Sequence, residues 1–112
     1  FDTSSVTNMG GMFFSVGTRN SNFTLDVSNF DTSNVTDTSQ MFYSTGSSST
    51  KFITTITMRN PNIKSYVMMF YQTGNTGSKI TVNYTKETSS IIDKIISAGP
   101  PNANVVKGVQ VD

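Results

Sequence analysis

Hydrophobic residues recur along this chain at a spacing of 28–29 residues. Segment 1–14 recurs as segment 30–43, and eight of the fourteen positions are identical at an offset of 29. A shorter third copy follows, in which Met69–Gly74 repeats Met41–Gly46 at an offset of 28 with one difference. One unit of this length cannot bury its apolar side alone, whereas stacked units bury a shared core. The spacing therefore predicts one domain of three to four stacked units, near residues 1–29, 30–57 and 58–84.

Each unit contains a segment with the alternation of a β-strand. Apolar and polar side chains alternate over residues 23–28, and less regularly over 52–57 and 80–84. Strict alternation is typical of a strand with one buried face. The strands and the recurring apolar positions together predict the residues of the core. These are Phe13, Leu25, Val27, Phe30, Val35, Met41, Phe42, Ile56, Ile63, Met69 and Phe70.

Two further segments have helical features. Thr36 is placed to cap a short helix or 3₁₀ turn over residues 37–43. Residues 89–96 carry apolar side chains at i, i+1, i+4 and i+5, and Gly99 with Pro100 ends that pattern. We expect residues 85–99 to form a helix that caps the last unit. Residues 100–112 are then a terminal strand or a linker.

One stretch of the second unit resembles a known family. Residues 25–37, followed by Met41-Phe42-Tyr43, resemble the BspA-like bacterial surface-protein repeat, also described from Mycoplasma lipoproteins and Listeria surface proteins. The resemblance covers roughly residues 1–74, and the third unit departs from it at Arg59–Asn62. It implies an α/β repeat solenoid: a leucine-rich-repeat-like, right-handed coil with one short parallel strand and one short helix or 3₁₀ turn per repeat. It also implies a secreted or wall-attached protein that acts in adhesion, partner binding or stalk building.

Composition agrees with an extracellular setting. The 112 residues carry 13% charged and 35% hydrophobic side chains, and 17 Thr, 16 Ser and 11 Asn fill much of the remainder. The net charge of +1 gives no electrostatic basis for binding nucleic acid. The absence of cysteine excludes a disulfide scaffold, and no apolar run approaches the ~20 residues of a membrane helix. Because the chain opens inside the motif, we expect it to be a fragment of a larger protein.

The chain offers little for catalysis. It has neither His nor Cys, and its carboxylates are Asp2, Asp26, Asp31, Asp37, Glu87, Asp93 and Asp112. Asp2 and Asp31 occupy equivalent repeat positions, which indicates a turn residue used twice. The oxygen donors between Asp26 and Asp31 lack the dense Asp/Asn/Gly pattern of calcium loops. We therefore expect no enzyme activity, no cofactor and no metal site.

The outward side of the strands is the expected binding surface. Its polar residues are Thr24, Asp26, Ser28, Thr55, Thr57, Thr81 and Asn83. Repeat proteins commonly bind partners through such a face, although threonine also serves strand propensity and solubility. The recurring Met-Phe-Tyr triplets are interpreted as core packing. The expected function is adhesion or spacing, with a host or matrix protein, a glycan, or neighbouring repeats as partners. A dedicated ligand-recognition domain and an accessory domain of a secreted enzyme are the alternatives.

Overall fold

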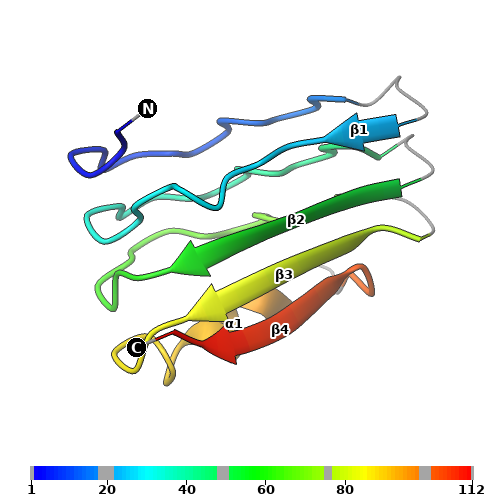
Figure 1. Ribbon diagram of the computed structural model, residues 1–112. Coiled ribbons are helices and arrows are strands. Elements are labelled where there is room, and N and C mark those ends of the chain that lie inside the picture. Colours follow the sequence, from blue (N-terminus) through cyan, green and yellow to red (C-terminus); the bar gives the residue numbers. More distant parts are fainter. Residues whose placement is uncertain (1, 18–21, 48–50, 75–76, 99–101, 112) are drawn as a thin grey trace.

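The computed structural model describes residues 2–17, 22–47, 51–74, 77–98 and 102–111. These residues form four parallel strands, β1 (Asn22–Thr24), β2 (Lys51–Met58), β3 (Lys79–Tyr84) and β4 (Val105–Gln110), and one helix, α1 (Ile92–Ser97). The strands make one sheet in chain order, β1-β2-β3-β4, as Figure 1 shows. The side chains of residues 22–24 and 51 lie outside the described part.

Alternation along the strands creates the buried face of the sheet. In β2 the side chains of Phe52, Thr54, Ile56 and Met58 are buried. The register pairs Thr54 with Ile80 and Ile56 with Val82, which brings buried residues of β2 and β3 onto the same face. β-branched side chains pack well on a pleated surface, and β2, with eight residues, is the longest regular element of the described residues.

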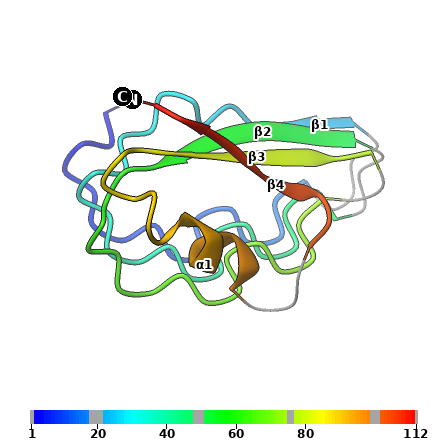
Figure 2. The ribbon, with the colours of Figure 1, turned by 90° about the horizontal axis from the view of Figure 1, so that it is seen from below.

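A second layer lies opposite this sheet and contains little regular secondary structure (Figure 2). We call it the turn layer; it consists of residues 7–16, 36–46 and 64–74. Neighbouring units pair here as well: the Met9 N–H donates to the Asp37 carbonyl oxygen at 2.8 Å, and the Phe42 N–H donates to the Met69 carbonyl oxygen at 2.9 Å. The core therefore lies between two hydrogen-bonded layers.

The helix expected over residues 37–43 is absent, and the partners of its amides explain why. The N–H groups of Met41, Tyr43 and Thr45 each bond a carbonyl three residues earlier, whereas those of Phe42 and Ser44 bond the third unit. Gln40 and Ser44 adopt positive φ angles of 57° and 56°, which a right-handed helix does not tolerate. Alternate amides thus serve a local turn and the neighbouring unit, so no continuous helical ladder forms.

The expected fold class is also wrong. An α/β repeat solenoid with a helix or 3₁₀ turn per repeat and a helical cap was expected. Instead the described residues form one small compact unit of 36 × 27 × 23 Å with a single parallel sheet. Its one described helix, α1, has six residues and links β3 to β4, which extends the sheet further. Figure 2 shows α1 on the same side of the sheet as the turn layer, so it belongs to the second layer and does not close the end of a stack.

The predicted core residues lie between the two layers to different depths. Val27, Val35, Met41, Phe42, Ile56, Met69 and Phe70 are buried, and Phe13, Leu25, Phe30 and Ile63 are partly buried against them. The core also includes side chains that the prediction left out. These are Met9, Phe52, Met58, Ile80, Val82, Ile92, Ile95 and Val105.

Candidate binding surface

The outward face of the sheet brings together part of the predicted binding set. Thr55 pairs with Thr81, and Thr57 pairs with Asn83, across β2 and β3. All four side chains are partly exposed, and their neighbours along each strand are buried except Tyr84, which is partly exposed as well. Thr24 lies in β1, and its side chain is outside the described part of the chain. The register therefore forms a short polar patch on the two central strands.

Asp26 and Ser28 lie beyond the end of β1 and bond to each other. Asp26 Oδ1 accepts hydrogen bonds from the Ser28 N–H at 2.9 Å and from its hydroxyl at 2.6 Å. The hydroxyl bond, followed by the N–H bond, lowers the pKa of the exposed Asp26 carboxyl. Both residues line a shallow hollow with Thr55 and Ile53. Asp26 and Ser28 thus reach only the edge of the outward face, beside Thr55.

Asn83 has a structural task on the same face. Its Oδ1 accepts a hydrogen bond from the Val109 N–H at 2.9 Å. Gly108 lies directly against this side chain, and a Cβ atom at that position would collide with Asn83 Oδ1. The sheet register shifts at this point between β3 and β4. Asn83 therefore stabilises the irregular end of β4. The hydrogen bond from Val109 occupies Asn83 Oδ1, the oxygen that would otherwise face a ligand.

The acidic residues of the repeats serve in turns. Asp2, Asp31 and Asp37 each accept a hydrogen bond from the N–H two residues later, at 2.8, 2.9 and 2.8 Å. In Asp31 the Ser33 hydroxyl and N–H lower the carboxyl pKa, and the charge of Arg59 adds to this effect. In Asp2 the Ser4 N–H is the main cause of the lowered pKa. Such side-chain-to-backbone bonds stabilise tight turns. Over the described ranges, no cluster of three acidic residues is placed to hold a metal ion.

The Met-Phe-Tyr triplets divide between the core and the surface. The rings of Phe13, Phe42 and Phe70 stack inside the protein, with centroids 5.5 and 5.7 Å apart. The residues that follow them form a second row, which we call the outer aromatic row: Phe14, Tyr43 and Tyr71. Its centroids are 4.7 and 4.9 Å apart, and Phe14 is 48% exposed. The interpretation as core packing is therefore wrong for the third position and, in the first unit, also for Met12, which is 39% exposed. Two of the three residues at the third position carry a hydroxyl group, which was the signal for partial exposure.

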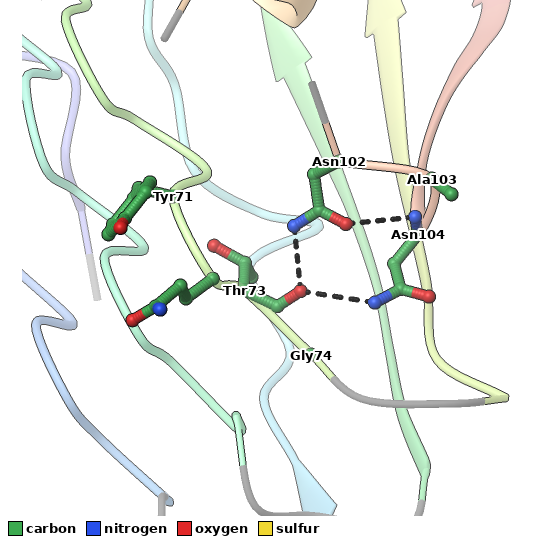
Figure 3. Close-up of a pocket in the computed structure, with 7 residues that line it drawn as sticks. Tyr71, Thr73, Gly74, Asn102, Ala103 and Asn104 are labelled. Carbon is green, nitrogen blue, oxygen red and sulfur yellow. Dashed lines mark hydrogen bonds between the residues drawn. The ribbon is translucent and has the colours of Figure 1, made fainter. Parts of the chain in front are cut away.

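A hollow of about 260 Å³ lies at the Tyr71 end of this row (Figure 3). We call it the Tyr71 hollow; it is lined by Tyr71, Gln72, Thr73, Gly74, Asn102, Ala103 and Asn104. Asn102 Nδ2 donates to the carbonyl oxygens of Phe70 and Thr73 at 2.9 and 2.8 Å, and Asn104 Nδ2 donates to that of Thr73 at 3.3 Å. Sequence reasoning missed this site because its two walls are about thirty positions apart along the chain.

Among the comparisons with known proteins, a family model gives a match. No match is found among the curated proteins or among the solved structures. None of the helices in the described residues has the length and apolar character to cross a membrane. A family model described as "Mycoplasma protein of unknown function, DUF285" matches residues 1–87, which is most of the sequence. The chain therefore belongs to the DUF285 family.

Proposed function

We propose that this chain is a non-enzymatic, extracellular module of a bacterial surface protein, acting in adhesion or as a spacer. Two observations support the setting: membership of the DUF285 family, and the resemblance of residues 25–43 to the BspA-like surface repeat. The abundance of Thr, Ser and Asn with few charges fits the same setting.

The observation that carries the proposal is the way in which consecutive units are joined. Besides the backbone bonds of both layers, buried threonine hydroxyls bond across units. The Thr45 hydroxyl donates to the Phe13 carbonyl oxygen, and the Thr73 hydroxyl donates to the Phe42 carbonyl oxygen, both at 2.5 Å. Buried, fully paired polar groups favour one rigid arrangement. The carboxylates of the turns are also hydrogen-bonded within the chain. A rigid module of this kind is suited to act as a spacer or to present a binding surface.

Ligand recognition by the outward face of the sheet is the second candidate. The observation that favours it is the short polar patch in which Thr55 pairs with Thr81, beside the hollow that Asp26 and Ser28 line. A host protein or a glycan is the expected partner on this face. The accessory role in a secreted enzyme has no comparable observation behind it.

One exchange experiment separates the two roles. In cells that carry the parent protein, residues 1–112 are replaced by an unrelated rigid domain of similar length, and attachment to host cells or matrix is measured. Unchanged attachment supports the spacer role, whereas lost attachment supports adhesion by the module itself. In the second case the pair Asp26→Lys and Thr55→Lys should abolish attachment if the outward face is used. A purified chain that turns over a substrate would contradict the proposal.

A further inference from the structure

Tyr71 presents an aromatic surface at the Tyr71 hollow. Among the described residues its ring stacks on one other ring, that of Tyr43, with centroids 4.9 Å apart and planes tilted by 41°. The tyrosine is only half-buried, and Figure 3 shows it across the hollow from Asn102. A partly exposed aromatic ring combines an apolar face with a polar tip, and its electron-rich face attracts weakly positive C–H groups. One face of a pyranose ring carries such C–H groups.

The opposite wall supplies amide groups. Hydrogen bonds within the chain occupy most of the Asn102 side-chain amide. Its Nδ2 donates to two carbonyl oxygens, and its Oδ1 accepts from the Asn104 N–H at 2.9 Å. The Asn104 side chain donates only one long hydrogen bond, from Nδ2 to the Thr73 carbonyl oxygen at 3.3 Å. Gln72 accepts a bond of 3.4 Å from the Ser44 hydroxyl. Asn104 and Gln72 therefore retain both donors and acceptors, the combination that pairs with adjacent sugar hydroxyls.

Charge and size narrow the ligand class. All seven residues that line the hollow are uncharged. An ionic ligand would lose hydration there without gaining a partner of opposite charge. The volume of about 260 Å³ lies just below the roughly 300–1,000 Å³ of pockets for drug-sized molecules. The site accommodates one ring and leaves the rest of a longer ligand in solvent.

We propose that the Tyr71 hollow binds one uncharged sugar residue of a glycan, with the pyranose ring stacked on Tyr71 and its hydroxyls bonded by Asn104 and Gln72. Sugar binding at this hollow would define the ligand class of the module described under the proposed function. Its biological role rests on that proposed function. The binding itself is a property of the purified chain, so it is testable apart from location or attachment.

The test is a titration of the isotope-labelled chain with the methyl glycosides of glucose, galactose, mannose and N-acetylglucosamine, followed by amide chemical shifts. We expect saturable shifts at Tyr71, Gln72 and Asn104 with at least one glycoside, with affinity in the millimolar range. Ala103→Phe should abolish them, because Ala103 lines the hollow and is exposed, which lets the larger ring fill the space without disturbing the core. Phe14→Ala is the matched control, since Phe14 belongs to the same aromatic row but packs on Tyr43 and does not line the hollow; it should retain the shifts.

Three results would overturn the proposal: no saturable shift with any of the four glycosides, saturable shifts confined to the outward face of the sheet, or full binding by the folded Ala103→Phe variant. Each leaves the surface location and the spacer role standing. Conversely, a chain that binds a glycoside but is found only inside the cell would refute the proposed function and not the site. The two failures are thus distinguishable.

Discussion

The ring of Phe42 stacks on that of Phe70 with centroids 5.7 Å apart and planes only 5° apart. These residues are 28 positions apart and occupy the same place in consecutive units. Because the Phe42 N–H also donates to the Met69 carbonyl oxygen, backbone and side chain fix the same register. The internal aromatic stack is therefore the place where the repeat spacing of the sequence becomes contact in space.

Replacing Phe42 by Ala should reduce the free energy of unfolding by about 3–5 kcal/mol, because Phe42 is fully buried and stacks on both sides. Urea denaturation measures the change. Phe14→Ala is the control in the outer aromatic row; with 48% of its surface already exposed, it should cost only about 1 kcal/mol. Equal costs for the two variants would refute the inner and outer assignment of the rows.

Thr38→Val should stabilise the protein by about 1 kcal/mol. Thr38 is fully buried, and its hydroxyl has no hydrogen-bond partner among the described residues. Valine has nearly the same shape and removes the unpaired polar group. Thr45→Val provides the contrast, because the Thr45 hydroxyl donates to the Phe13 carbonyl oxygen, and its loss should destabilise by a similar amount. A lower melting temperature for Thr38→Val would show that its hydroxyl has a partner.

Gly108→Ala should destabilise the chain by about 1–3 kcal/mol, because the added Cβ meets the side chain of Asn83. Combining it with Asn83→Ala removes the contact with Asn83 Oδ1 and leaves the one with Thr81 Cγ2 at 2.7 Å, so the double variant should cost less than the sum of the two single changes. A double-mutant cycle by chemical denaturation measures this coupling. Costs that add to within about 0.5 kcal/mol would mean that the two residues do not touch.

Acid should weaken the turns that Asp2, Asp26 and Asp31 stabilise. Hydrogen bonds from nearby serines lower the pKa of all three carboxyl groups in the folded chain. A folded pKa below the unfolded value of about 3.9 gives stability that is present above pH ~4 and is lost as the pH falls through the folded pKa. Ser28→Ala should raise the pKa of Asp26 toward its ordinary value, as NMR titration of the carboxyl carbon would measure. An unchanged titration of Asp26 would contradict the Ser28 contribution.

The sequence predicted the strands better than the layer opposite them. Alternation is a local signal, and Ile56 and Val82 lie on the buried face as their spacing indicates. The segment 37–43 looked helical because its apolar residues and the cap at Thr36 are local too, whereas the N–H of Phe42 bonds a unit 27 residues away. Partners at that distance are invisible to propensity.

The candidate sites, too, could be predicted only where local patterns determine them. Thr55 and Thr81 could be placed on one face from alternation and repeat spacing alone. The hydrogen bond from the Val109 N–H to Asn83 depends on the irregular register between β3 and β4. No sequence pattern predicted this irregularity. To predict the Tyr71 hollow, two facts would have been needed: that the third triplet position faces outward, and that Asn102 donates to the Phe70 carbonyl oxygen.

The proposed function requires that this module stands on the outside of a bacterial cell. The most direct measurement is antibody labelling of the native parent protein on intact cells, with permeabilised cells as the reference and a cytoplasmic protein as the control. We predict equal labelling before and after permeabilisation, with the control labelled only afterwards. Labelling of the module only after permeabilisation would contradict the claim.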